Sequence, residues 1–181
     1  MDYVSQTRRL ALALTALMVM ALALLSCRSV DWFVLKRSLR NKFGDDDWIT
    51  TRQLADWLAN KRRPAPVLLD VRAEAEWNVS HLPRARRVEP DASAATAAKD
   101  IAKDAPIVTY CSVGYRSAKM AQRLRNAGYT NVQNLEGSIF EWANEHRPLV
   151  RDGEPTKQVH PYSALRGHLL RDEVRAPLPP N

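Results

Sequence analysis

The chain has 181 residues, of which 45% are hydrophobic and 26% are charged, and its formal net charge at pH 7 is +7. This length allows one domain with a buried core. The basic residues are scattered without a basic-aromatic stripe, which argues against a nucleic-acid groove. The positive charge would attract small anionic substrates or anionic lipid, although its ordinary role is to keep a surface solvated.

Residues 1–26 have the pattern of an export signal. Arg8 and Arg9 precede an uncharged run from Leu10 to Leu25, and the segment ends in Leu-Leu-Ser before Cys27. A basic start, an apolar middle and small residues at the end are typical of such signals. The four residues from Leu24 to Cys27 resemble the lipobox of bacterial lipoproteins, and this resemblance implies that Cys27 is lipidated and becomes the first mature residue. We therefore expect a membrane-anchored protein on the periplasmic side.

An uncleaved membrane helix is the alternative to a cleaved signal. The apolar run is shorter than the about 20 residues that usually span a bilayer. More basic residues follow the run than precede it, so the positive-inside rule would then place the domain in the cytoplasm. Those that follow are Arg28, Lys36, Arg37, Arg40 and Lys42. A buried helix of a soluble protein is the least favoured interpretation.

Residues 27–46 form a basic amphipathic tether in the sequence. Trp32, Leu35, Leu39 and Phe43 recur at helical spacing among lysines and arginines. Such an apolar stripe would lie on an anionic membrane surface or pack on the following domain, and the sequence favours neither.

The region 47–147 alternates predicted strands with predicted helices. We predict strands at 48–49, 67–71, 87–88, 107–110 and 132–135, and helices at 51–62, 74–79, 92–102, 117–127 and 138–145. Strands that alternate with helices imply one α/β domain, in which a parallel sheet carries helices on both faces. Ligands of such sheets bind beyond the C-terminal ends of the strands.

Cys111 lies where one of these strands ends. The β-branched run before it suits a buried strand, and the segment Ser112–Arg116, with Gly114 inside it, leads into a stretch of helix formers. Backbone N–H groups in such a turn can hold an anion, and the helix dipole together with Arg116 favours the thiolate. An inert buried cysteine is the commoner case, but it needs neither the glycine nor the arginine. We therefore predict that Cys111 is a nucleophile that handles an anion.

The spacing between Cys111 and Arg116 separates two groups of cysteine enzymes. Cysteine-dependent phosphatases and arsenate reductases need Cys-x5-Arg, so that the loop wraps a tetrahedral phosphate. Here the spacing is Cys-x4-Arg, one residue shorter. The sequence CSVGYRS resembles the loop of rhodanese-type sulfurtransferases, which holds a cysteine persulfide.

Two further motifs extend the resemblance to about residues 47 to 147. The segment PVLLDVRAEAEWNVSHLPRA resembles the rhodanese signature, with matches at Asp70, Arg72, Glu76, Trp77, His81, Leu82 and Ala85. The segment VQNLEGSIFEW resembles the family's strand followed by Gly-Gly-x-x-x-Trp, with matches at Gly137 and Trp142. Ser80, Arg84 and Ser138 stand where the usual pattern has glycine, so the turn geometry at these positions is open.

The resemblance implies sulfur transfer by double displacement. The Cys111 thiolate would take the sulfane sulfur of thiosulfate or a similar small anionic donor, and a thiol or cyanide would then accept it. The residues expected to bind the substrate are Ser112, Val113, Gly114, Tyr115 and Arg116, and those expected to position the loop are Asp70 and Arg72. We expect no cofactor, and no metal site, because the four histidines are dispersed.

Two other functions stay open at the sequence level. One is a weakly catalytic rhodanese-like module that binds a partner or senses redox state through Cys111. The other, less favoured because the loop is short, is phosphatase or arsenate reductase chemistry. Residues 148–181 lie beyond the resemblance, and the stretch HPYSALRGHLL predicts a short docking helix through Tyr162, Leu165 and Leu169.

Overall fold

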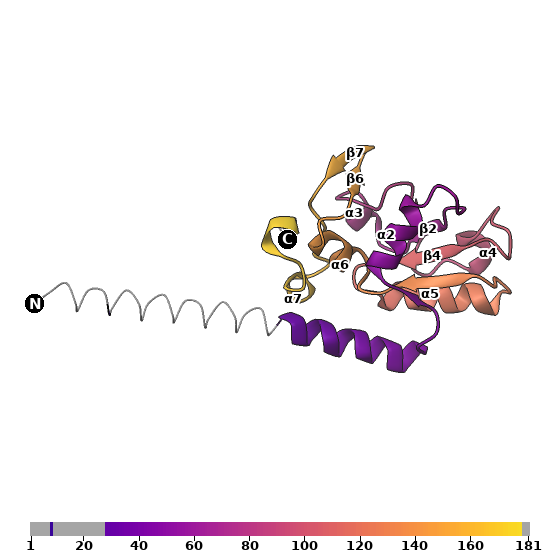
Figure 1. Cartoon of the computed structure of the whole chain (residues 1–181), viewed down its shortest axis with the longest axis horizontal. Helices are drawn as coiled ribbons and strands as arrows, with labels where there is room; N and C mark the ends of the chain where they lie inside the picture. Colours follow the sequence, from indigo (N-terminus) through magenta and orange to yellow (C-terminus); the bar gives the residue numbers. More distant parts are fainter. Residues whose placement is uncertain (1–7, 9–27, 179–181) are drawn as a thin grey trace, which may run out of the picture. The chain divides into compact units, whose positions relative to one another are not determined.

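The computed structural model describes residue 8 and residues 28–178 of the chain (Figure 1). The predicted lipidation site Cys27 and nearly all of the predicted signal lie outside the described residues. Residues 28–43 are helical, and among the described residues no helix combines the length and apolar character that a membrane crossing requires. The chain divides into two compact units, residues 1–35 and 36–181. The site lies in the second unit.

Five strands form a single parallel sheet in the order β1-β5-β4-β2-β3. They are β1 (Trp48–Ile49), β2 (Val67–Asp70), β3 (Arg86–Arg87), β4 (Ile107–Tyr110) and β5 (Val132–Leu135). The central strand β4 is buried along its whole length, and Asp70 of β2 lies opposite Tyr110 of β4. The C-terminal ends of the two central strands therefore meet at one edge of the sheet.

Helices cover both faces of this sheet, which confirms the predicted α/β architecture. They are α2 (Thr51–Ala59), α3 (Glu74–Trp77), α4 (Ala94–Ala97), α5 (Tyr115–Asn126) and α6 (Ser138–Asn144). Helices α4 and α5 pack together on one face, and α2 packs with α6 on the other (Figure 1). Met120 and Leu124 of α5 are fully buried in the core, as the helical spacing predicts.

Local chemistry explains where the helices begin and end. Thr50 caps α2 in a capping box with Gln53, and the helix ends at Ala59 because Asn60 adopts an extended conformation. Helix α5 begins two residues earlier than predicted, directly after Gly114. The predicted helix 92–102 is wrong in length, because α4 has only four residues. Asp100 has a positive φ of 64° that no helix accommodates, so tertiary structure outweighs the helix propensity of the alanines.

The C-terminal residues contribute a hairpin that the sequence analysis missed. Strands β6 (Leu149–Arg151) and β7 (Glu154–Thr156) are antiparallel, and helix α7 (Ala164–Gly167) and the 3-10 helix η1 (Asp172–Val174) follow. Val150 also pairs with His81 through two backbone hydrogen bonds of 2.9 Å. The predicted docking is correct for Leu169, which is buried, but wrong for Tyr162 and Leu165, which are 51% and 76% exposed. Helix α7 makes only about one turn, so it has no extended apolar face to pack against the domain.

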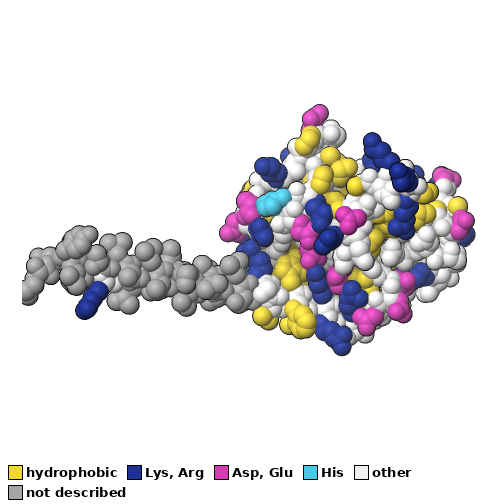
Figure 2. Space-filling model, viewed as in Figure 1, with side chains coloured by type: hydrophobic (Ala, Val, Ile, Leu, Met, Phe, Trp, Pro, Cys, Tyr) yellow, Lys and Arg dark blue, Asp and Glu magenta, His cyan; other side chains and the backbone are white. Residues whose placement is uncertain are grey.

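Part of the predicted tether packs on the domain. Leu39 is 5% exposed, and Lys36 and Arg40 form ion pairs with Glu141 and Glu136 at 2.6 Å and 2.9 Å. Residues 36–43 are thus a structural part of the second unit. On the face shown in Figure 2, lysine and arginine side chains are interspersed with acidic ones.

Candidate active site

Cys111 begins a tight loop between the C-terminal end of β4 and the first turn of α5. Its side chain is buried, and the backbone N–H of Gly114 donates to the Cys111 Sγ at 3.2 Å. Gly114 has a φ of 114°, a conformation that residues with a Cβ rarely adopt, so glycine allows the chain to turn back toward the sulfur. The N–H of Cys111 donates to the Ser138 Oγ at 3.2 Å, which fixes the start of the loop.

The surroundings of Cys111 favour its thiolate. Burial raises the pKa of the thiol, but the positive charge of Arg116 and hydrogen bonds from Ser117 and Gly114 outweigh burial, so the pKa lies below its ordinary value of 9.0. The Ser117 hydroxyl is buried beside the sulfur and contributes to the lowered pKa of Cys111, and it makes no other hydrogen bond among the described residues.

Arg116 is held by a carboxylate beneath the loop. Its two terminal nitrogens donate to the two carboxylate oxygens of Glu76, each at 2.7 Å, and Arg116 Nη2 also donates to Ser112 Oγ at 2.8 Å. The Ser112 hydroxyl donates to Glu76 at 2.6 Å. Burial raises the pKa of Glu76, but Arg116 and Ser112 more than offset this, and the pKa is lowered. The positive charge of Arg116 thus stabilises the Cys111 thiolate, while its N–H groups donate to Glu76 and Ser112.

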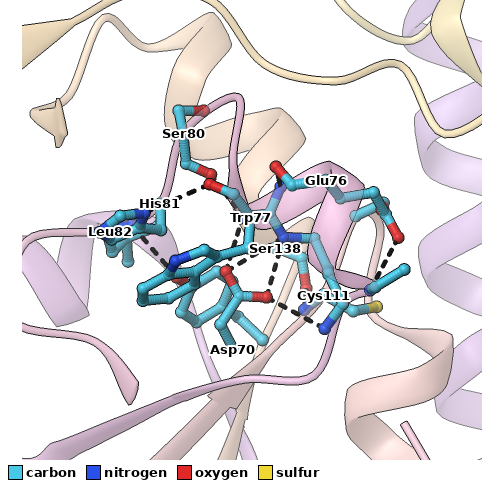
Figure 3. A network of polar contacts seen from close by, with 12 residues as sticks. Asp70, Glu76, Trp77, Ser80, His81, Leu82, Cys111 and Ser138 are labelled. Carbon is cyan, nitrogen blue, oxygen red and sulfur yellow. Dashed lines mark hydrogen bonds and ion pairs between the residues drawn. The ribbon is translucent and has the colours of Figure 1, made fainter. Parts of the chain in front are cut away.

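Asp70 and Arg72 lie beneath this ion pair and have no solvent exposure. Their side chains form an ion pair at 2.6 Å, and Arg72 also donates to the backbone carbonyls of Ser80 and Glu76. Figure 3 shows Cys111 and Glu76 on one side of Asp70, and His81 and Leu82 on the other. The Asp70–Arg72 pair therefore fixes the segment that carries Glu76. This arrangement fits the predicted positioning role of the two residues.

His81 is part of the scaffold in this arrangement. Its ring stacks on Trp77 with centroids 3.5 Å apart and planes 4° apart. Burial lowers the pKa of His81, and the ring does not line the cavity at Cys111.

A cavity of about 130 Å³ opens at the cysteine. The structure brings together nearly all of the predicted site residues, since its lining includes Cys111, Ser112, Val113, Tyr115 and Arg116. Gly114 acts through its backbone instead. The same cavity is lined by two residues that the sequence analysis did not assign to the site, Tyr162 and Arg166. They come from the C-terminal residues, and no spacing in the sequence links them to Cys111.

Two serines also act at the site without having been predicted to do so. Ser117 directly follows the loop arginine, and that position next to a predicted thiolate is the signal that could have identified it. Ser138 had counted only as a departure from glycine. It has a left-handed φ of 51°, and its hydroxyl accepts from Cys111 and donates to the Leu135 carbonyl at 3.1 Å. The side chain thus offsets the strain of its backbone.

A family model for the rhodanese-like domain matches residues 52–145. The chain belongs to the rhodanese-like domain family. It is 35% identical over 103 residues to the probable adenylyltransferase/sulfurtransferase MoeZ of Mycobacterium tuberculosis, across 55% of this chain and 25% of that protein. It is 33% identical over 121 residues to the tRNA uridine(34) hydroxylase of Cronobacter sakazakii, across 62% of this chain and 34% of that protein.

A solved structure of a rhodanese-like domain protein from Staphylococcus aureus is similar, with 26% identity and a TM-score of 0.51. That match covers 59% of this chain and 98% of the other. The chain therefore aligns with almost the whole of that solved chain, but with only a quarter to a third of the length of the two named enzymes. Tyr162 and Arg166 lie beyond the residues that the family model matches.

Proposed function

We propose that this protein is a rhodanese-type sulfurtransferase that carries sulfur as a persulfide on Cys111. The observation that carries the proposal is the environment of the sulfur, in which a backbone N–H, a buried hydroxyl and a nearby guanidinium all favour an anion. Membership of the rhodanese-like family and the similarity to proteins named sulfurtransferases support it.

The proposed reaction has two displacements. The Cys111 thiolate attacks the outer sulfur of thiosulfate, a new S–S bond forms, and the S–S bond of the donor breaks, so that sulfite leaves with the bonding electron pair. The outer sulfur of the persulfide is then attacked by a thiolate or cyanide, which restores the Cys111 thiolate. The Gly114 N–H and the Ser117 hydroxyl would stabilise the anionic sulfur in both states.

The competing chemistry, phosphate ester hydrolysis, fits the loop less well. An arginine that binds a phosphate in bidentate fashion needs two free N–H donors, whereas the Arg116 nitrogens here bind the two oxygens of Glu76. A pure binding module would not need a thiol whose pKa is lowered by three separate neighbours. These observations favour sulfur transfer over phosphate chemistry and over a module that only binds a partner, and the mass experiment below distinguishes sulfur transfer from redox sensing through Cys111.

Intact-mass measurement of the full chain after thiosulfate treatment tests the proposal. We expect the mass of one sulfur atom to be gained at Cys111, lost again on addition of cyanide, and absent in Cys111→Ser. No gain of mass by the wild-type protein, or Cys111-dependent hydrolysis of an aryl phosphate, would contradict sulfur transfer.

We also propose that the chain is attached to the membrane through lipid on Cys27, with the domain on the periplasmic side. The support is the Leu-Leu-Ser-Cys sequence at the end of an uncharged run. Cys27→Ala should abolish incorporation of a clickable fatty acid and leave the precursor unprocessed. A wild-type chain that takes no label and retains Met1 would instead indicate an uncleaved membrane helix.

A further inference from the structure

The outer wall of the Cys111 cavity is built by the C-terminal residues rather than by the family domain. Tyr162 and Arg166 line the cavity together with the loop, although the family model ends at residue 145. Part of the cavity lining therefore comes from residues beyond the family model's match.

The two arginines of the cavity differ in what they are free to bind. Arg116 is engaged by Glu76 and Ser112. The Arg166 guanidinium is exposed, and within residues 28–178 no hydrogen bond or ion pair occupies it. None of the residues that line the cavity is acidic. Of the two arginines that line the cavity, Arg166 is therefore the one whose guanidinium N–H groups are available to an incoming anion.

Two lysines near the cavity, Lys42 and Lys119, add to the positive charge around it. Lys42 donates to the Tyr115 hydroxyl at 3.2 Å, and Lys119 lies 5.1 Å from the centre of the Tyr115 ring. Both lysines therefore stand beside a residue that lines the cavity. An anionic ligand that approaches Cys111 meets positive charge from the family domain as well as from Arg166.

The segment that carries Arg166 is fixed to the domain. Leu169 and Leu170 are buried, and the Asn144 side chain donates to the Leu169 carbonyl at 2.8 Å. A Cβ on Gly167 would lie 2.9 Å from the Cβ of Pro161, so glycine lets α7 pack closely there. Arg166 is therefore held at the cavity even though its side chain is exposed.

Tyr162 is also held in place, in a strained conformation. Its φ is 65°, and its N–H donates to the His160 Nδ1 at 3.0 Å. Burial lowers the pKa of His160, which favours the neutral ring. The Tyr162 ring lies 4.9 Å from the guanidinium carbon of Arg116, and thereby covers part of the loop. A strained residue that closes one side of a reactive cavity is consistent with a role in binding.

We propose that Arg166, with Tyr162 beside it, forms an oxyanion subsite that holds the charged head group of the sulfur donor while its sulfane sulfur faces Cys111. The subsite selects small donors with a sulfonate or carboxylate head group over uncharged ones. The identity of the bound molecule as a sulfur donor rests on the proposed function, whereas the preference for an anion near Cys111 does not. Because the head group is charged before and during the reaction, the subsite should act on binding rather than on the chemical step.

Alkylation of Cys111 by a charged and an uncharged reagent tests the subsite without sulfur transfer. Iodoacetate carries a carboxylate and iodoacetamide does not, so the ratio of their rates at Cys111 reports anion binding near the sulfur. In Arg166→Gln we expect this ratio to fall about fivefold, as for loss of one exposed charge pair, with the iodoacetamide rate nearly unchanged. Arg171→Gln is the matched control, because Arg171 is exposed on the same extension and does not line the cavity. An unchanged ratio in Arg166→Gln, or an equal fall in both variants, would overturn the proposal.

Steady-state kinetics with thiosulfate provide the second measurement. Arg166→Gln should raise KM about fivefold and leave kcat within about twofold, and Arg166→Lys should restore part of the loss. A fall in kcat at unchanged KM would contradict a binding role for Arg166. If the wild-type protein gains no sulfur from thiosulfate, the proposed function fails, while the alkylation ratio still decides whether the anion subsite exists.

Discussion

The two walls of the Cys111 cavity, an inner wall on the family domain and an outer wall on the C-terminal residues, differ in whether their polar groups already have hydrogen-bond partners. On the inner wall, Glu76, Ser112 and Arg116 satisfy one another through four short hydrogen bonds. On the outer wall, Arg166 is exposed and without a partner among the described residues, and neighbouring Leu165 is 76% exposed. Groups that set the chemistry of the sulfur are fixed before any ligand arrives, because fixed dipoles stabilise charge without reorganising. Under the proposed subsite, the guanidinium of Arg166 stays without a partner until an anion binds.

The comparison also separates the roles of the two arginines. Arg116 was predicted to bind substrate, and it does line the cavity, but its hydrogen bonds go to Glu76 and Ser112. Its closest link to the chemistry is electrostatic, since its charge lowers the pKa of Cys111. Direct binding of the donor by Arg116 stays a prediction, and Arg166 has the freer donors.

The largest expected effect is on the inner wall. Glu76→Gln removes the charge that pairs with Arg116, and we expect the free energy of unfolding at pH 7 to fall by about 2 kcal/mol, less than for a fully buried pair because Arg116 is partly exposed. Since the pKa of Glu76 is lowered from 4.5, the wild type has this stability above pH 4.5 and loses it as the pH falls further. The difference between the proteins should therefore shrink in acid.

Urea unfolding at several pH values measures this difference. Glu74→Gln is the control, because Glu74 is exposed on the same helix α3. Equal stability of the Glu76→Gln and Glu74→Gln proteins at pH 7 would mean that the inner wall does not depend on its ion pair.

A smaller effect is expected from the hydroxyl that holds the start of the loop. Ser138→Ala leaves the buried N–H of Cys111 without its acceptor and keeps the left-handed backbone, so we expect a loss of about 1.5 kcal/mol. Ser138→Gly loses the same hydrogen bond but relieves the strain, and should be less destabilising than the alanine variant. Thermal unfolding of the two variants gives the order. The reverse order would show that the backbone at residue 138 is not strained.

Ser117→Ala should change the chemistry of the sulfur more than the stability of the fold. Without this donor the thiolate loses one stabilising contact, so the pKa of Cys111 should rise toward 9.0. The rate of iodoacetamide alkylation should then reach half its maximum at a higher pH, and its value at pH 7 should fall about threefold. Ser93→Ala, at the cap of α4, is the control and should leave the profile unchanged. An unshifted profile in Ser117→Ala would exclude the hydroxyl as a donor to the thiolate.

The smallest effect on stability is expected at the outer wall. Tyr162 is 51% exposed and its ring lies 4.9 Å from the guanidinium carbon of Arg116, so Tyr162→Ala should change the free energy of unfolding by less than about 0.5 kcal/mol. Removal of the ring opens the cavity, and the rate of iodoacetamide alkylation at Cys111 should rise. A loss of stability as large as that of Glu76→Gln would show that the two walls do not differ as described.

The sequence by itself determined the parallel α/β fold, the strand-to-helix position of Cys111 and the loop residues from Ser112 to Arg116. These features depend on local order along the chain: β-branched residues form β4, Gly114 permits the turn, and Arg116 follows within the same loop. The motifs around Asp70 and Glu76 could be matched in the same way, because each is a short run with fixed spacing.

Only the tertiary structure decided what completes the site. Glu76 pairs with Arg116, which lies 40 positions away in the sequence. Tyr162 and Arg166 reach the cavity because the chain returns through β6 and β7. The burial of Leu169 and Leu170 then holds this returning segment on the domain. Nothing in the residue pattern fixes that return path, since it depends on packing between distant surfaces. The nucleophile is therefore a local property of this sequence, whereas the surface that meets its ligand is a property of the whole fold.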